Sequence, residues 1–377
     1  MFTLFKTFFF LGWISFGGPA AHIGYFRNTF VKKLHWLSEE EYGQLVALSQ
    51  FLPGPGSSQV GFAIGYKKAG IVGAFTAFFA FTLPSVLIML SLAALSSTVT
   101  ETATFQAVVH GLKLLAVVVV FEAILGMYQN FCKERTTVLL ATVTAITLLI
   151  YGGTAVQIGT LVFAASVGAR KLTGEPQPVQ RKATINMIPM LTFVLLISIG
   201  FASPLLMGGT KVFAEFFQAG SLVFGGGHVV LPLLQSIVGS QLSPDEFLTG
   251  YAAAQAIPGP MFTLATYLGY FLLPESPILG ALTATIAVFL PGFLLILAVL
   301  QNWHTLAKQP KLAGAIKGVN AAVVGLLMSA LYSPIFTEAV FNTVDMAVVI
   351  LGIVLLKQFK MPIVWLVVLF AVLGCVV

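Results

Sequence analysis

The feature that most constrains this sequence is a series of long stretches without Asp, Glu, Lys or Arg. These stretches lie at 69–100, 136–169, 183–210, 247–274, 276–307 and 318–337. Each meets or exceeds the roughly 20 residues that a helix needs to cross the hydrocarbon core of a bilayer. Only 8% of the 377 residues are charged, which leaves too little polar surface to cover a soluble globule. The chain is therefore predicted to be an all-α, polytopic membrane protein.

The net charge of +6 does not indicate nucleic-acid binding, because the basic residues sit in short loops between apolar runs, where they orient a membrane protein. Cys132 and Cys375 match no CxxC or metal-ligand spacing. The HExxH, GxGxxG and GxSxG patterns of embedded hydrolases or reductases are also missing. We therefore expect no enzyme activity, cofactor, metal or nucleic-acid partner.

An internal repeat with an offset of about 206 residues organises the chain. The matched positions are Phe16-Gly17-Gly18 with Phe224-Gly225-Gly226, Gln50 with Gln255, Pro53-Gly54-Pro55 with Pro258-Gly259-Pro260, and Leu83-Pro84 with Leu290-Pro291. Similar apolar composition alone would not keep Gly and Pro in this order. We predict an N-terminal repeat at 1–172, a linker with one extra span at 173–209, and a C-terminal repeat at 210–377.

Each repeat is predicted to contain two broken helical hairpins. In the first repeat, residues 2–34 break at Phe16-Gly17-Gly18-Pro19, and residues 38–66 break at Pro53-Gly54-Pro55. Arms of about 15 residues rise only ~22 Å, which is short for a full crossing. We therefore interpret them as re-entrant hairpins whose breaks line the transport path, since irregular backbone at membrane depth needs protein or water around it. Four ordinary spans follow, at about 70–98, 104–130, 136–150 and 154–170.

The distribution of basic residues favours repeats of opposite orientation. If the amino terminus is cytoplasmic and the span at 184–203 inverts the second repeat, Lys211 is the only basic residue in an outer loop. Parallel repeats would instead place Lys308, Lys311, Lys357 and Lys360 outside.

The four breaks offer an anion site that needs no charged side chain. Pro is tolerated in the first turn of a helix, and the free N–H groups behind it carry the positive end of the helix dipole. Ser57, Ser58, Gln59 and Thr263 add donors. Gly and Pro could instead serve helix packing alone, but packing does not explain paired breaks followed by donors. The candidate substrate-binding residues are Gly17, Gly18, Pro19, His22, Arg27, Gln50, Pro53, Gly54, Pro55, Gly56, Ser57, Ser58, Lys113, Gly225, Gly226, Gly227, His228, Gln255, Pro258, Gly259, Pro260 and Thr263.

Several of these candidates have an alternative structural role. His22 and His228 follow glycine breaks, but buried histidines are more often satisfied structural groups, and Arg27 could equally be an interfacial anchor. Lys113 and Glu122 lie nine residues apart on one predicted span and so face opposite sides. We predict anion attraction for Lys113, and proton relay or charge balance for Glu122.

Two acidic motifs fit a structural role better than a chemical one. Ser38 is followed three residues later by Glu41, and Ser243 is followed three residues later by Glu246. This spacing is typical of a capping box at the start of a helix.

The chain resembles the chromate ion transporter family in its two-half form. The segments that carry the resemblance are WISFGGPAAHIGYFR (13–27), WLSEEEYGQLVALSQFLPGPGSSQVGFAIG (36–65), FGGGHVVLPLL (224–234) and AQAIPGP (254–260). The resemblance implies a multi-pass plasma-membrane protein with antiparallel halves that exports chromate, confers chromate resistance and meets sulfate as a chemical mimic. Gly227 stands where the first half has Pro19, so a weaker or bent helix start is expected there.

The leading functional hypothesis is alternating-access export of a tetrahedral dianion. Outward passage of an anion gains about 2.3 kcal/mol per charge per 100 mV of inside-negative potential, so export needs no coupled cation. Proton-coupled uptake or exchange of sulfate or another oxyanion is the alternative, and a channel is a third class that saturable flux would exclude. The expected partners are chromate or sulfate and the lipid bilayer, with a homodimer left open as an assembly.

Overall fold

The computed structural model describes the chain except for residues 100–101, 174–184, 225–226, 302, 304–308 and 377. The first part of the chain forms α1 (Phe2–Ile14), α2 (Gly18–Phe26), the π-helix η1 (Arg27–Lys33), α3 (Glu39–Phe51), α4 (Gly56–Val99), α5 (Ala103–Phe131), α6 (Arg135–Tyr151) and α7 (Thr154–Lys171). The helix α8 (Met187–Phe201) and the short η2 (Ser203–Leu205) follow.

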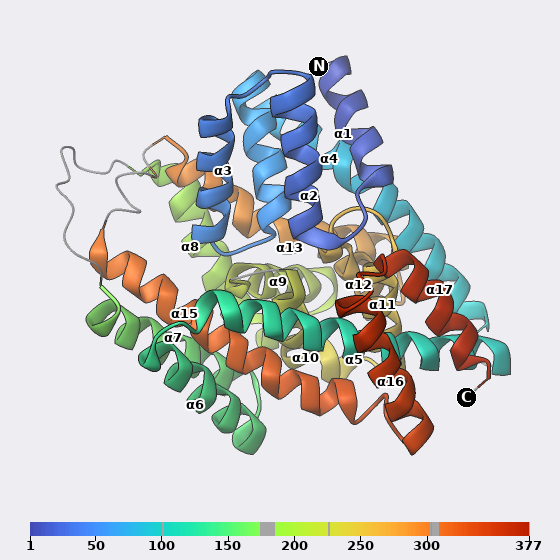
Figure 1. The fold of residues 1–377 in the computed structure, drawn as a ribbon. Helices are drawn as coiled ribbons and strands as arrows, with labels where there is room; N and C mark the ends of the chain where they lie inside the picture. The colour runs from blue at the N-terminus through green and yellow to red at the C-terminus, as the bar shows by residue number, and fades with distance from the viewer. Residues whose placement is uncertain (100–101, 174–184, 225–226, 302, 304–308, 377) are drawn as a thin grey trace.

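The second part forms a similar succession of elements. These are α9 (Gly208–Leu222), η3 (Gly227–Val229), α10 (Val230–Val238), η4 (Gly239–Gln241), α11 (Pro244–Ala256), η5 (Met261–Thr263), α12 (Leu264–Leu272), α13 (Pro277–Val299), α15 (Pro310–Ala330), the π-helix η6 (Leu331–Phe336), α16 (Thr343–Lys357) and α17 (Ile363–Gly374). In Figure 1, α1 to α4 lie together at the top of the view, and α9, α10 and α12 lie near the middle. Helices α5 and α15 cross the lower part beside α6 and α7.

The apolar helices confirm a polytopic membrane protein. Within the described residues, four helices are long and apolar enough to cross a bilayer: Gly56–Ser96, Gln106–Phe131, Pro277–Val299 and Pro310–Phe336. Helices α5, α6, α7 and α8 agree to within three residues with the ranges predicted at 104–130, 136–150, 154–170 and 184–203.

The chain turns sharply where the sequence predicts the end of a short arm. In α4, Ala69 (φ −151°) and Gly70 (φ 62°) have non-helical backbone angles, so this helix consists of an arm at 56–68 and a span at 71–99. An added Cβ at Gly65 would lie 2.4 Å from the carbonyl oxygen of Gly73, so the arm and the span touch backbone to backbone. The arm α12 touches α13 in the same way, because a Cβ at Gly269 would lie 2.5 Å from the oxygen of Gly280.

Both predicted capping boxes are confirmed. The hydroxyl of Ser38 accepts a hydrogen bond from the Glu41 amide (3.1 Å), and the Glu41 carboxylate accepts one from the Ser38 amide (2.9 Å). Ser243 and Glu246 make the same two bonds at the same distances. These bonds satisfy amides that would otherwise be unpaired, so α3 and α11 begin at chemically matched positions.

Helices from the two parts of the chain interleave. Helix α15 packs against α6 and α7, α17 against α5, and α12 against α4. An added Cβ at Gly168 of α7 would lie only 2.2 Å from the oxygen of Gly314 on α15. Buried residues from both parts of the chain belong to one hydrophobic cluster.

Candidate functional site

Each Pro-Gly-Pro break contacts the glycine break of the other half. The Gly54 amide donates a hydrogen bond to the carbonyl of Val223 (2.7 Å), and the Gly259 amide donates one to the carbonyl of Ser15 (2.9 Å). Ser15 and Val223 are the residues directly before Phe16 and Phe224, where the glycine breaks begin. The four predicted breaks are thus joined in two reciprocal pairs.

Glycine is required at the centre of each Pro-Gly-Pro break for two reasons. Gly54 has φ 121° and Gly259 has φ 97°, a region that L-residues rarely adopt. An added Cβ at Gly54 would lie 3.0 Å from Cα of Gly292, and one at Gly259 would lie 2.8 Å from Oγ of Ser85. Gly292 directly follows Pro291 inside α13, and Ser85 directly follows Pro84 inside α4. The two contacts therefore join matching positions of the two halves, so this packing is reciprocal as well.

The glycine breaks of the two halves also approach each other. An added Cβ at Gly227 would lie 3.1 Å from Cγ of Pro19 and 3.7 Å from the sulfur of Met261. Helix α2 begins at Gly18 with Pro19 in its first turn, as predicted. The second half starts instead with a 3-10 turn at Gly227–Val229, which confirms the bent start expected without a proline. Gly225 and Gly226 lie outside the described residues.

His22 connects the first glycine break to the start of α4. Its fully buried imidazole has Nε2 3.1 Å from the carbonyl oxygen of Ser15 and Nδ1 3.1 Å from Oγ of Ser57. Because a carbonyl can only accept, Nε2 carries the proton, and in the neutral ring Nδ1 accepts from the Ser57 hydroxyl. These bonds satisfy both nitrogens, as in the structural alternative that the sequence left open.

His228 lies against two side chains of α11. Its Nδ1 is 3.3 Å from the Tyr251 hydroxyl and 3.3 Å from Nε2 of Gln255. The structure therefore brings together His228 and Gln255, which the sequence singled out, and adds Tyr251, which it did not. Tyr251 precedes Gln255 by one helical turn and so lies on the same face, but Val46 occupies the matching position of the first half.

Several buried polar atoms around the breaks have no protein partner. Among the described residues these include Oγ of Ser15, Oγ of Ser58, Oε1 of Gln59 and Oγ1 of Thr82. Each of these residues is at most 4% exposed. Buried polar groups are normally paired, so unpaired ones indicate room for a ligand or ordered water. Ser15 and Thr82 were missed by the sequence reasoning, although each directly precedes a motif of the repeat.

The contacts also define which donors are free. The amides of Gly54 and Gly259 are used between the halves, and Nε2 of Gln59 donates to the carbonyls of Pro53 (2.9 Å) and Gly292 (3.3 Å). Helix α4 begins at Gly56, directly behind the break. The first amides of a helix have no partner within it, so the first turn of α4 presents backbone amides together with the unpartnered hydroxyl of Ser58.

The predicted cationic residues lie away from the breaks. Arg27 forms a two-pronged ion pair with Glu39 (both N–O distances 2.9 Å) at the exposed end of α2. Lys113 on α5 pairs with Asp245 in the first turn of α11. Asp245 lies near the start of the thirteen-residue α11, and Pro258 lies two residues beyond its end, so nearly the whole helix length of ~20 Å separates them.

The matched helices α3 and α11 have different surroundings. Helix α11 packs against α5, α12 and α17, and Gln255 near its end is 8% exposed. Helix α3 packs against α4 and η1, and the matching Gln50 is exposed. Lys113 and Asp245 hold α11 on α5, and His110, one turn before Lys113, has Nε2 2.8 Å from Oδ1 of Asp345 on α16.

Among the described residues, the carboxylates of Glu122 and Glu215 each have a buried oxygen without a protein partner. Glu122 on α5 has a buried Oε2 without a protein partner. Glu215 on α9 is 4% exposed, with Oε1 3.7 Å from Nζ of Lys211 and 3.1 Å from Nε2 of Gln241, while its Oε2 has no partner. The sequence reasoning missed Glu215, for which the four-residue spacing from Lys211 was the available signal.

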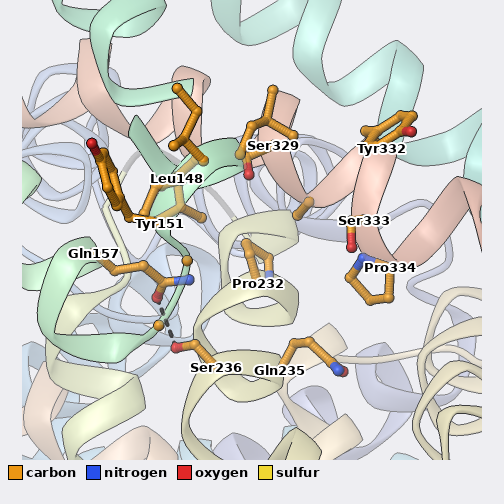
Figure 2. A pocket seen from close by; sticks show the side chains of 16 residues that line it. Leu148, Tyr151, Gln157, Pro232, Gln235, Ser236, Ser329, Tyr332, Ser333 and Pro334 are labelled. Atoms are coloured by element: carbon orange, nitrogen blue, oxygen red, sulfur yellow. Dashed lines mark hydrogen bonds between the residues drawn. The ribbon is translucent and has the colours of Figure 1, made fainter. Parts of the chain in front are cut away.

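A cavity of about 550 Å³ opens beside α10 (Figure 2). Pro232, Gln235 and Ser236 of α10 form one wall, and Ser329, Tyr332 and Ser333 form another. The hydroxyl of Ser236 donates to Oε1 of Gln157 on α7 (2.7 Å). Helix α10 begins directly after η3, which follows the second glycine break. The nine-residue α10 therefore connects that break to the wall of this cavity.

Comparison with known proteins identifies the family. The family model described as chromate transporter matches residues 2–170 and 210–375. A probable chromate transport protein of Synechococcus elongatus is 29% identical over 334 residues, covering 85% of this chain and 81% of that protein. The chromate transport proteins of Pseudomonas aeruginosa and Cupriavidus metallidurans are 28% and 27% identical, over 86% and 93% of this chain and 78% and 86% of theirs.

No solved structure matches the chain. The family is one of transporters, which agrees with the apolar helices and confirms that the chain is not an enzyme. The chain belongs to the chromate transporter family and is a multi-pass membrane transporter.

Proposed function

We propose that this protein exports chromate from the cytoplasm by alternating access, with the substrate bound where the four breaks meet. The reciprocal hydrogen bonds from Gly54 to Val223 and from Gly259 to Ser15 carry this proposal. They support two halves of inverted topology, bounded at 1–172 and 210–377, whose re-entrant hairpins contact each other across a common centre. Chromate resistance in the cell would follow from this activity.

The donors at this centre fit a tetrahedral oxyanion. Chromate offers four oxygens that accept hydrogen bonds, and the first turn of α4 presents backbone amides with the positive end of the helix dipole. The hydroxyls of Ser58, Ser15 and Thr82 are buried without protein partners, so they can donate to a bound ion without breaking existing bonds. Neutral donors are also compatible with release, because the ion leaves no unpaired buried cation behind.

The unequal surroundings of α3 and α11 support an alternating mechanism. Inverted halves exchange their conformations when access switches sides. In this structure α11 is held on α5 through Lys113 and Asp245, whereas the matched α3 leaves Gln50 exposed. We interpret the α11 contact as the closed gate and the region beside α3 as the open one. The cavity beside α10 is then a vestibule on the path from the second glycine break (Figure 2).

Export is the direction that the membrane potential favours. A dianion leaving an inside-negative cell gains about 4.6 kcal/mol per 100 mV, twice the value for one charge. The decisive experiment compares chromate flux into everted and right-side-out vesicles at imposed potentials. Accumulation in everted vesicles with a positive interior supports export, and uptake confined to right-side-out vesicles with a proton gradient excludes it.

Proton-coupled uptake or exchange of sulfate is the second candidate function. The buried Glu215, with one unpartnered carboxylate oxygen, is the observation that favours it, since a carboxylate in the membrane core can carry a proton. Glu122 is a further candidate relay. Sulfate flux that requires a proton gradient and is lost in Glu215→Gln would support this alternative.

A further inference from the structure

A groove between α1 and the arm formed by α2 and η1 has features of a separate binding site. It has a volume of about 530 Å³, and its walls include Lys6, Phe10 and Ile14 from α1 and Tyr25, Thr29 and Lys33 from the opposite arm. It shares no lining residue with the centre where the breaks meet. Its two lysines come from opposite walls of this one cavity.

The charge at this groove is not balanced by nearby acids. Lys6 and Lys33 are exposed. On the neighbouring α3, Glu39 is paired with Arg27, Glu41 is paired with Lys67 (3.0 Å), and Glu40 accepts a hydrogen bond from Gln44 (3.4 Å). None of the residues that line the groove is acidic. The groove therefore presents positive charge and would attract a negatively charged group.

Beyond the lysines, most of the lining is apolar or aromatic, and Thr7, Asn28 and Thr29 are its polar exceptions. Phe10 is 62% exposed, and Ile14 and Tyr25 are each 37% exposed. Lys6, Phe10 and Ile14 follow one another at helical spacing on α1, so the cationic end of the groove continues into an apolar strip. A small hydrated anion would gain nothing from that strip, whereas a ligand with a phosphate and a hydrocarbon chain would use both parts.

We propose that this groove binds an anionic phospholipid. The headgroup phosphate lies between Lys6 and Lys33, and one acyl chain lies along Phe10 and Ile14. Basic pockets between membrane helices recognise anionic headgroups through the same combination. Because the groove is bounded by α1 on one side and by the arm that follows the first glycine break on the other, the bound lipid holds these two elements together.

The test measures thermal unfolding of the purified full-length protein in detergent with added phosphatidylglycerol, phosphatidylcholine or inorganic phosphate. We expect phosphatidylglycerol to raise Tm more than phosphatidylcholine does, because a ligand that binds only the folded state stabilises it. The variant Lys6→Gln/Lys33→Gln should lose that difference. The matched control Lys357→Gln/Lys360→Gln removes two exposed charges elsewhere and should keep it.

Two results would overturn the proposal. An equal loss in both double variants would show a general charge effect rather than a site. An increase in Tm with inorganic phosphate that matches the phosphatidylglycerol effect and depends on Lys6 and Lys33 would show a small-anion site. If the double variant does not fold, the single variants Lys6→Gln and Lys33→Gln replace it in the test. Each is expected to reduce in part the increase in Tm that phosphatidylglycerol causes. Native mass spectrometry of retained lipid provides an independent readout.

Discussion

Replacing Gly54 by Ala should disable transport without preventing membrane insertion. The residue has φ 121°, and the new Cβ would lie 3.0 Å from Cα of Gly292, which is backbone and cannot rotate away. A non-glycine residue in such a conformation costs about 1–3 kcal/mol, and loss of the hydrogen bond to Val223 costs about 1 kcal/mol. Together these effects disfavour the assembled centre by about 2–4 kcal/mol, which corresponds to a population roughly 30 to 700 times lower.

The matched control is Gly70→Ala. Gly70 also has a positive φ (62°), but an added Cβ there meets no atom within 4 Å. This variant should lose stability through backbone strain yet retain chromate flux. Flux of labelled chromate into everted vesicles, normalised to folded protein by size-exclusion chromatography, measures both. Wild-type flux in Gly54→Ala, or equal loss in Gly70→Ala, would refute the reasoning that the reciprocal contact is required.

The remaining predictions concern the gate, the binding donors and the Arg27 pair. Lys113→Asp should impair transport, and adding Asp245→Lys to that variant should restore transport in part. If both proteins fold and the double variant transports no better than Lys113→Asp, this pair is not part of the gate. Ser58→Ala should raise the KM for chromate about tenfold, the loss expected for one buried hydrogen bond to an ion, and an unchanged KM would exclude that hydroxyl. The hydrogen bond and charge of Arg27 lower the pKa of Glu39 below its usual value. A carboxylate whose pKa is lower in the folded state stabilises the protein above the unfolded pKa, and this stability is lost as pH falls through the folded pKa. Glu39→Gln should therefore remove a small decrease in Tm at acid pH. Identical profiles of Tm against pH for the variant and the wild type would contradict this.

The sequence predicted features that depend on local chemistry. The breaks at Gly17-Gly18 and Pro53-Gly54-Pro55 were found because Gly and Pro determine backbone conformation wherever they occur. The caps at Ser38 and Ser243 were found because a capping box closes within four residues. The bent start at Gly227 followed from the missing proline.

The partners of these motifs could not be predicted, because they come from distant parts of the chain. Lys113 was expected to attract an anion, but its partner Asp245 is 132 residues away and lies on α11. The contact of His22 with Ser57, 35 residues away, depends on how α2 packs against α4. Tyr251 has no polar counterpart in the first half, so the repeat could not identify it.

The same contacts indicate which parts of the protein can move. The hydrogen bonds of Gly54 and Gly259 link each Pro-Gly-Pro break to the opposite half, so a motion that separated the breaks would have to break both bonds at the buried centre of the protein. The far ends of α3 and α11 are held by ion pairs instead. Glu39 and Arg27 are both exposed, and exposed pairs contribute little stability. The pair of Asp245 and Lys113 has one exposed partner, Asp245, and one buried partner, Lys113. Access is therefore expected to change by tilting of α3 and α11 about a fixed centre, and a cysteine cross-link between α11 and α5 should stop transport.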